Sequence, residues 1–456
     1  MLPGEERRHR IDLSDPVILV SIALVVTGLL LSQSLPVPVA AGLLLLCQIL
    51  AFWQPVAVFY LMPVALAVFP IHFSVGSARF SYLEATLLLG ISGSLLRSTL
   101  SVIGARDRTA TLRKFLSCVS QADFAGLALG LLLVGTVSLG TLANPDHLRE
   151  ASREWRWTIL EPVLWYSAAL LVLRSSQHAR RLIALWVLSA AGTAVASVVL
   201  WFAGGGLAVE GVRRLAGLHP HPNAAALALE RPAVIALVLA AAAISPWWFW
   251  SAATAPLLAA VGLTFSRGAL LGLWGGLLVA LWQLGKRRLA CAFLLAGCLL
   301  AFVLALLFPA RLQAELWAGG DALRLAIWRS SLAMVRDYPL TGVGLDQYLY
   351  QYVPRYVEPR AWSERFTSHP HNLILDFWLR LGIAGLLLLG SALWLVVRRV
   401  RSSFRDHWTV ALAAGLAAGA IHGSLDRGYF APDLAASFWL VAVILDLLRL
   451  VDRRSS

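Results

Sequence analysis

The chain has 456 residues, of which 59% are hydrophobic and 14% are charged, and its formal net charge is +13. Its mean hydropathy is +0.74. A water-soluble domain of this length needs a more polar surface, so the composition excludes an ordinary soluble protein. It indicates a membrane protein with many spans, because a helix needs about 20 apolar residues to cross a bilayer.

The apolar segments, taken in chain order, predict the secondary structure. About fourteen of them cover residues 16–33, 37–53, 56–73, 82–103, 123–143, 157–174, 181–203, 223–243, 246–264, 267–284, 289–310, 372–397, 408–424 and 432–449. They do not alternate polar and apolar residues as barrel strands do. We therefore expect an all-α fold, a polytopic transmembrane helical bundle of about 12–14 spans. The segments 56–73 and 223–243 are candidates for broken or re-entrant helices.

The basic residues predict the orientation. After MLPGEERRHR comes a long apolar run without a small-residue cleavage site, which favours a cytoplasmic tail and a first span. With this end inside, the following basic loops fall on the cytoplasmic side: RSTLSVIGARDRTATLRK, RSSQHARR, GKRR, RRVRSSFRDH and VDRRSS. This pattern obeys the positive-inside rule and explains the net charge without a nucleic-acid partner. We predict a multi-pass protein of the cytoplasmic (inner) membrane with both termini in the cytoplasm.

One long loop, residues 311–370, falls on the outer side. Within it, DALRLAIWRSSLAMVRDY predicts an amphipathic helix that begins near Asp321 and ends before Pro339. Tyrosines are frequent between Tyr338 and Tyr356. Such residues either form an aromatic belt at the membrane interface or contact sugar or lipid. We expect a partly helical extracytoplasmic loop.

Four groups of polar residues are predicted to share the outer side. They are RRLAGLHPHPN at 213–223, Arg267 within TFSRGA, Arg324 on the loop helix, and the stretch 369–372. Each has a structural explanation, since arginines extend to the interface or are solvated in loops, and His371 could cap the next helix. Together they indicate a functional site, because ionisable residues at membrane depth are costly and tend to mark function.

The residue types at this site suggest its chemistry. Arginine matches phosphate oxygens with a planar fork of donors and stays charged. Histidine accepts a proton near neutral pH. A lipid diphosphate is an anionic partner available at a membrane surface, and arginines would stabilise its charge as it leaves. This combination predicts glycan transfer from a polyprenyl diphosphate to a sugar hydroxyl.

The histidines also allow a metal site. HPHPN and HPHN supply four histidines on one side, and imidazole binds zinc or nickel. However, no carboxylate or cysteine stands at a recognisable ligand spacing beside them. Two histidines separated by one proline also do not naturally turn both rings toward one ion. We therefore expect no metal and no cofactor, with the metal site as the less favoured alternative.

Several short motifs resemble the O-antigen ligase family. The pair HN at 371–372 is followed after nine residues by GIAG at 382–385, which is similar to the family's H-N-x9-G-x-x-G signature. The segment RLAIWRSSLAMVRDYPLTGVGLDQY resembles the family's loop, in which an arginine opens a helix that leads into P-L-x-G-x-G. TFSRGALLGL, LHPHPNAAALAL and IHGSLDRGYFAPDLAASFWL resemble its S-R-G element, its P-N element and its final pair of spans.

The resemblance implies a role for individual residues. His371 matches the histidine thought to be the general base, and Arg267 and Arg324 match arginines assigned to the donor diphosphate. Arg214 is a further candidate for that diphosphate. Gly382 and Gly385 would let helices pack closely beside the site. The family works without a metal.

The resemblance also suggests how the chain is divided. It covers residues 205–449, which we expect to form the catalytic membrane region and to include the loop 311–370. Residues 1–204 would be N-terminal transmembrane helices, and residues 450–456 a cytoplasmic tail. The predicted number of spans exceeds the family's usual twelve or so. Either some spans are split, or the N-terminus carries additional helices.

The sequence therefore predicts a metal-independent inverting glycosyltransferase of the O-antigen ligase type. Its partners would be a polyprenyl-diphosphate-linked glycan donor, a lipid or glycan acceptor, and membrane lipids. One alternative is an O-antigen or capsule polymerase of the same superfamily. Another is a polysaccharide flippase or exporter, which should show charged residues near mid-span and often internal repeats. The spans are mostly plainly apolar, which disfavours transport.

Overall fold

The computed structural model describes residues 15–31, 36–76, 78–209, 211–307, 320–403 and 406–452. Its main helices are α1 (Pro16–Leu31), α2 (Val37–Trp53), α3 (Pro55–Ala67), α4 (Tyr82–Ile103), α5 (Arg108–Ser120), α6 (Ala125–Leu142), α7 (Leu148–Trp155), α8 (Glu161–Val172), α9 (Ser176–Phe202), α10 (Pro222–Ala241), α11 (Trp247–Leu263), α12 (Arg267–Gln283), α13 (Arg287–Leu307), α15 (Gly320–Asp337), α16 (Tyr348–Arg355), α17 (Leu373–Ser402), α18 (His407–Gly423) and α19 (Pro432–Asp452). Short helical turns are η1 (Pro145–His147), η2 (Arg156–Leu160) and η3 (Pro359–Glu364). Two antiparallel hairpins complete the described part, β1 (His72–Val75) with β2 (Ala78–Ser81) and β3 (Leu207–Val209) with β4 (Val212–Arg214).

The predicted all-α fold is confirmed, and each predicted apolar segment contains a helix. Among the described residues, α4, α6, α9, α10, α13 and α17 are long and apolar enough to cross a membrane. The bent pair α2 and α3, at 117° to each other, would raise that number to 7. The other predicted spans form shorter or more polar helices; α12 and α18, for example, have 17 residues each. The segment 223–243 forms the continuous helix α10 despite Pro232, so it is not broken as considered above.

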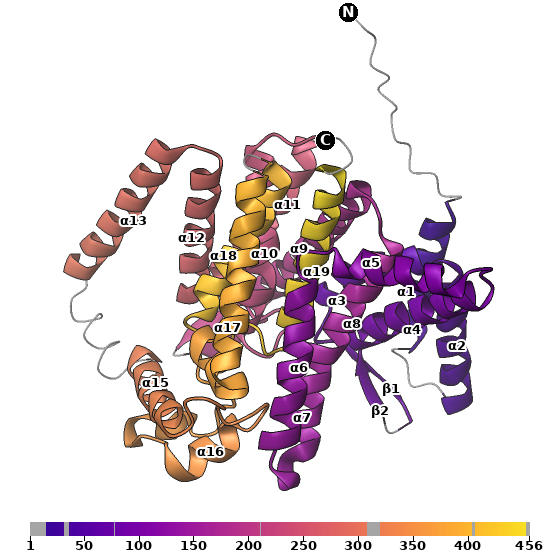
Figure 1. Cartoon of the computed structure of the whole chain (residues 1–456). Helices are drawn as coiled ribbons and strands as arrows, with labels where there is room; N and C mark the ends of the chain where they lie inside the picture. The colour runs from indigo at the N-terminus through magenta and orange to yellow at the C-terminus, as the bar shows by residue number, and fades with distance from the viewer. Residues whose placement is uncertain are drawn as a thin grey trace, which may run out of the picture.

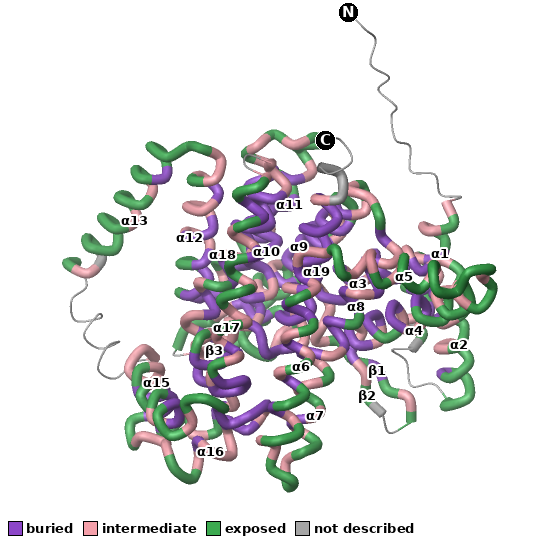
Figure 2. The backbone as a smooth tube through the Cα atoms, viewed as in Figure 1, coloured by how far each residue is buried: buried purple, intermediate pink, exposed green. Residues whose placement is uncertain are grey.

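The core of the bundle lies around α10, which is surrounded by α9, α11, α12 and α18 (Figure 1). Buried residues concentrate in these central helices, whereas α13 is largely exposed along its length (Figure 2). Glycines allow α12 and α18 to approach closely. A Cβ atom at Gly272 would lie 2.7 Å from the carbonyl oxygen of Ala418, and one at Gly276 would lie 2.7 Å from that of Ala414. Small residues spaced in this way are typical of packed membrane helices.

The loop helices α15 and α16 lie at one end of the bundle, near the beginning of α17 (Figure 1). The basic turn between α12 and α13 lies at the opposite end. This arrangement agrees with the prediction that the long loop 311–370 and the basic loops lie on opposite sides of the membrane. Residues 311–319 of that loop, and residues 453–456 of the predicted tail, lie outside the described residues. Which end faces the exterior remains a prediction.

Helix α17 is broken at Gly382, where φ is 66° and ψ is −156°. The carbonyl of Leu379 accepts hydrogen bonds from the amides of Val343 (2.6 Å) and Gly344 (3.1 Å). In return, the amide of Ile383 donates to the carbonyl of Leu340 at 3.0 Å. The segment after α15 therefore supplies hydrogen bonds that the broken helix lacks. This contact fixes α15 and its loop against the first turns of α17.

Candidate active site

A cluster of two histidines and one aspartate lies where α17 begins and α18 ends. Oδ1 of Asp426 is 3.3 Å from Nδ1 of His371 and 3.7 Å from Nε2 of His369. The two imidazole rings have centroids 4.1 Å apart. Asp426 is buried, while His371 keeps part of its side chain accessible. The cluster therefore has the composition of a base and a carboxylate that orients it.

The backbone of the 368–372 segment explains why both histidines reach the same carboxylate. His371 has a positive φ of 51°, an uncommon conformation for a residue with a side chain. The next residue, Asn372, caps α17: its Oδ1 accepts from the amides of Ile374 and Leu375, both at 3.0 Å. Its Nδ2 donates to the carbonyl of Ser424 at 3.0 Å, which ties this segment to the loop that carries Asp426. The helix cap is thus Asn372, and the side chain of His371 is left for another role.

The surroundings of the cluster set its charge. Burial raises the pKa of Asp426, but hydrogen bonds and charge interactions with His369 and His371 outweigh it and hold that pKa well below its usual range. Burial, together with the charge of Arg427, lowers the pKa of His369 well below its usual value. Nη2 of Arg427 lies 3.3 Å from Nδ1 of His369. At neutral pH the cluster therefore contains an ionised aspartate beside a neutral His369.

Arg214 joins this cluster through one intermediate residue. Its Nη2 donates to Oδ1 of Asn223 at 2.8 Å, and Nδ2 of Asn223 donates to Oδ2 of Asp426 at 3.0 Å. The Nε of Arg214 also donates to the carbonyl of Thr264 at 2.6 Å. The structure therefore links Arg214 of β4 to the aspartate through Asn223 at the start of α10.

Arg267 and Arg324 meet at a shared carboxylate. Nη1 of Arg267 is 2.9 Å from Oδ2 of Asp321, and Nη1 of Arg324 is 3.2 Å from Oδ1 of the same residue. One turn further along α15, Nε1 of Trp328 donates to the carbonyl of His371 at 3.3 Å. Residues four apart lie on one face of a helix. Arg324 therefore lies about one helical turn before Trp328, on the same face of α15 as the residue that contacts the histidine segment.

The two predicted packing glycines lie at the break of α17. A Cβ atom at Gly382 would overlap the carbonyl oxygen of Leu340, and one at Gly385 would overlap that of Phe377. The close approach at Gly382 is thus to the loop segment after α15, whereas that at Gly385 is to the preceding turn of α17 itself. Gly382 thus makes room for the loop segment that is held against α17, and Gly385 makes room for the break of α17 itself.

A group of three charged residues next to the histidine segment was not predicted. Arg380, on α17, is buried and pairs with Glu154 of α7, with 2.9 Å between Nε and Oε1, and also with Asp376. Its Nη2 donates to the carbonyl of Ser368 at 3.3 Å. A charged residue inside the apolar segment 372–397 was the available signal for Arg380. Nothing local marks Glu154, because its partner lies 226 residues away.

The metal alternative finds partial geometric support. Within the described part of the chain, His369, His371 and Asp426 place one ligand atom each within 4.8 Å of one another. The expectation that the spacing keeps the two rings apart is therefore wrong, because the positive φ of His371 brings them together. A nearby carboxylate is also present. However, the guanidinium of Arg427 lies against His369, and its charge disfavours a second cation there.

A long apolar cavity of about 330 Å³ extends along α17 from Leu373 to Val400. It is bounded also by α6, α12, α18 and α19, and Gly428 and Tyr429 line it next to the loop of Asp426. Its walls are almost entirely aliphatic and aromatic. The histidine cluster is thus close to the end of a space that suits a hydrocarbon chain.

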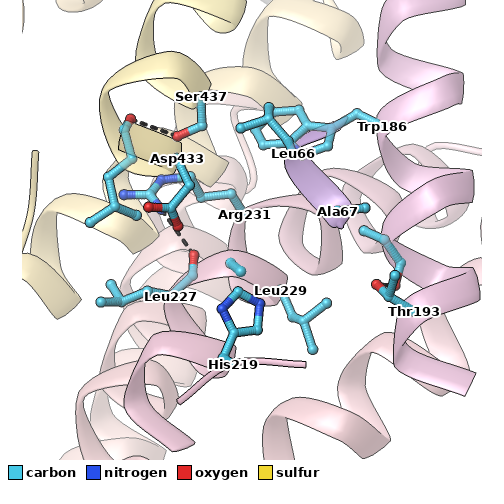
Figure 3. Close-up of a pocket in the computed structure, with 13 residues that line it drawn as sticks. Leu66, Ala67, Trp186, Thr193, His219, Leu227, Leu229, Arg231, Asp433 and Ser437 are labelled. Carbon is cyan, nitrogen blue, oxygen red and sulfur yellow. Dashed lines mark hydrogen bonds between the residues drawn. The ribbon is translucent and has the colours of Figure 1, made fainter. Parts of the chain in front are cut away.

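A second cavity, of about 20 Å³, lies on the other side of α10 and is lined by His219, Arg231 and Asp433 (Figure 3). The guanidinium of Arg231 donates to the carbonyl of Leu227 at 2.9 Å. Burial lowers the pKa of His219, although the charge of Asp433 opposes this shift. This volume accommodates no more than about one water molecule, so it is too small for a sugar or a lipid.

Fold and site together define a polytopic α-helical membrane protein with a polar site at one end of its bundle. A family model described as O-antigen ligase matches residues 252–390, which confirms the predicted resemblance for this stretch. The match supports a membrane function of the O-antigen ligase and polymerase type. The matched stretch contains Arg267, Arg324, His371, Gly382 and Gly385, whereas Arg214 and Asp426 lie outside it. Comparison with curated proteins gave no match.

Proposed function

We propose that the protein transfers a glycan from a polyprenyl-diphosphate-linked donor to an acceptor hydroxyl at the outer face of the cytoplasmic membrane. His371 acts as the general base for the hydroxyl. The acceptor oxygen attacks the anomeric carbon, the bond from that carbon to the diphosphate breaks, and the electron pair leaves with the diphosphate oxygen. A single displacement of this kind inverts the anomeric centre. No metal ion takes part.

The observation that carries this proposal is the pairing of His371 with Asp426. A buried carboxylate at Nδ1 favours the tautomer with its proton on that nitrogen, which leaves Nε2 as the acceptor. Thr367 lies 3.3 Å from Nε2, but its hydroxyl donates to the carbonyl of His369 at 3.0 Å. The lone pair on Nε2 is thus available for an incoming hydroxyl.

The arginines supply the second part of the mechanism. Arg267 and Arg324 are brought together by Asp321 at the start of α15, and Trp328, one helical turn further along α15, contacts the carbonyl of His371. Their fixed charges would stabilise the negative charge that develops on the leaving diphosphate. Arg214 would contribute indirectly by holding Asn223 and therefore Asp426. The polyprenyl chain of the donor would occupy the apolar cavity along α17.

The direct test is a transfer assay with the full chain reconstituted in liposomes. We expect transfer from an oligosaccharide linked to a polyprenyl diphosphate, and much slower transfer when the same oligosaccharide is linked to a polyprenyl monophosphate. A poorer leaving group with fewer oxygens for the arginines explains the difference. The acceptor that works, a lipid core, a protein or another lipid-linked glycan, then separates ligase from polymerase. Equal transfer from both donors would contradict the diphosphate site.

Glycan transport is a second candidate, favoured by one observation. Glu230 and Arg231 are buried on α10, and Oε2 of Glu230 lies 2.7 Å from Nδ1 of His422. Charged residues deep within a bundle are a property expected of transporters. Vesicles that move lipid-linked oligosaccharide between leaflets without forming a transfer product would establish this alternative.

The orientation is tested by the accessibility of single cysteines. Leu340 has an exposed side chain next to α15, and Arg287 is exposed at the start of α13, beside the basic turn. In a background without the native cysteines, a membrane-impermeant maleimide should label Leu340→Cys in intact cells. It should label Arg287→Cys only after the membrane is opened. The reverse pattern would place the site in the cytoplasm and contradict the proposed reaction.

A further inference from the structure

Asp321 forms ion pairs with both arginines that we assign to the donor diphosphate. Its two carboxylate oxygens are divided between them, Oδ2 toward Arg267 at 2.9 Å and Oδ1 toward Arg324 at 3.2 Å. Asp321 lies in the first turn of α15, whereas Arg267 begins α12, so the three side chains join two separate helices. A carboxylate that bridges two arginines occupies the position that a phosphate oxygen pair would take.

All three side chains remain accessible. The exposed fractions are 51% for Arg267, 26% for Arg324 and 37% for Asp321. Ion pairs at such exposure are weak, because water competes for each charge. A diphosphate that arrives from solvent or from the membrane surface can therefore displace the carboxylate at small cost. A deeply buried bridge would hold the arginines too firmly for that exchange.

On the basis of the proposed function, we propose that Asp321 is an exchangeable counter-ion that promotes release of the polyprenyl diphosphate product. In the donor, one terminal oxygen of the diphosphate is bonded to the sugar. After transfer, the carbon–oxygen bond is broken and that oxygen carries the charge. The product is therefore more negative than the donor linkage, and the arginines bind it more tightly. By returning to both arginines, Asp321 competes with this product and restores the empty site.

Asp321 is a positioning residue in this scheme, since it acts through the arginines and does not touch the reacting atoms. A purely structural role predicts a different behaviour. If Asp321 only held the arginines in place, its loss would weaken the binding of every anion. If it competes with the product, its loss strengthens binding of a diphosphate. The direction of the change in affinity separates the two roles.

The test measures equilibrium binding of farnesyl diphosphate to the full chain in nanodiscs of one lipid composition. Asp321→Asn should bind this probe on the order of threefold to tenfold more tightly than the wild type. Asp337→Asn is the matched control, because it removes a charge from the other end of α15 and should leave the affinity unchanged. In an Arg324→Ala background, the gain from Asp321→Asn should shrink. Asp321→Ala provides a second variant if the asparagine makes its own hydrogen bonds.

A kinetic readout completes the test. In the liposome transfer assay, Asp321→Asn should keep the single-turnover rate but slow the later turnovers, with stronger inhibition by added farnesyl diphosphate. Unchanged or weaker binding by Asp321→Asn would overturn the counter-ion role while leaving the proposed transfer intact. Binding that does not depend on Arg324 would overturn both the donor site and this inference.

Discussion

Nδ1 of His371 lies 3.3 Å from Oδ1 of Asp426, a residue 55 positions further along the chain. The first precedes α17 and the second follows α18, and Asn372 ties the two loops together through the carbonyl of Ser424. Asp426 is also held by the amide of Arg427 at 2.8 Å and by Asn223 at 3.0 Å. The carboxylate is therefore fixed on several sides, and its position fixes the imidazole of His371.

We predict that Asp426→Asn retains the fold but reduces the transfer rate by roughly 10²- to 10⁴-fold. Asparagine keeps the shape of the side chain but removes the charge that orients the imidazole and stabilises it once it has taken a proton. The measurement is the transfer rate at saturating donor, with Asp337→Asn as the control for the loss of a carboxylate. A rate within about threefold of the wild type would make the pair structural.

The free energy of unfolding of the protein should depend on pH through the protonation of His369. The pKa of His369 in the folded protein is well below its unfolded value of about 6.5. The unfolded chain thus binds more protons than the folded protein between these two pKa values, and stability falls as the pH is lowered through this range. The loss is at most about 1.4 kcal/mol per pH unit for one such group.

We predict that His369→Gln makes the fall in thermal midpoint between pH 7 and pH 5 shallower than in the wild type. Asp426 does not affect the slope between pH 7 and pH 5. Its pKa is also lowered in the folded protein, so the stability that its charge contributes is lost only below the unfolded pKa of about 3.9. His72→Gln, at an exposed position on β1, is the matched control and should keep the slope of the wild type. Parallel slopes for wild type and His369→Gln would show that His369 titrates normally.

The break in α17 provides a prediction about stability. Gly382→Ala places a side chain at a φ of 66° and against the carbonyl of Leu340, so it should destabilise the protein by at least about 1–3 kcal/mol and detach the loop after α15. Gly390→Ala lies on the same helix with no atom within 4 Å of its new Cβ, and should be neutral or slightly stabilising. Thermal unfolding in detergent compares the two. Equal midpoints would mean that the break relaxes without cost.

Removal of metal ions tests the alternative use of the histidine cluster. Because Arg427 lies beside His369, we expect a strong chelator to leave the transfer rate unchanged. Loss of transfer on chelation, with recovery on addition of zinc or another divalent ion, would instead assign His369, His371 and Asp426 as metal ligands.

The helical segments were predictable from hydropathy because each apolar run is separated from the next by charged or turn-forming residues. The number of spans was less predictable than the position of the helices. Helices α12 and α18 end within one residue of the predicted segments, but each has 17 residues, and whether a helix of this length spans a bilayer depends on its neighbours. The bend between α2 and α3 lies at Gln54, between the predicted segments 37–53 and 56–73, and α3 itself continues through Pro63.

The candidate site was predictable at the residues that stand in local motifs, such as His371, Arg267 and Arg324. Their partners were not, because the partners come from distant positions. Asp426 reaches His371 through the packing of α17 against α18, and Glu154 reaches Arg380 because α6 packs against both α7 and α17. The positive φ of His371 is a tertiary effect as well, and it reversed the argument made from the spacing of the two histidines.

The most direct test of the central claim compares wild type, His371→Ala and His72→Ala in the liposome transfer assay at matched protein amounts. The exposed His72 controls for the loss of an imidazole. The account predicts that His72→Ala transfers glycan at the wild-type rate while His371→Ala is slower by about 10²-fold or more, with donor binding retained. Transfer by His371→Ala at the wild-type rate would contradict the role of His371 as the general base.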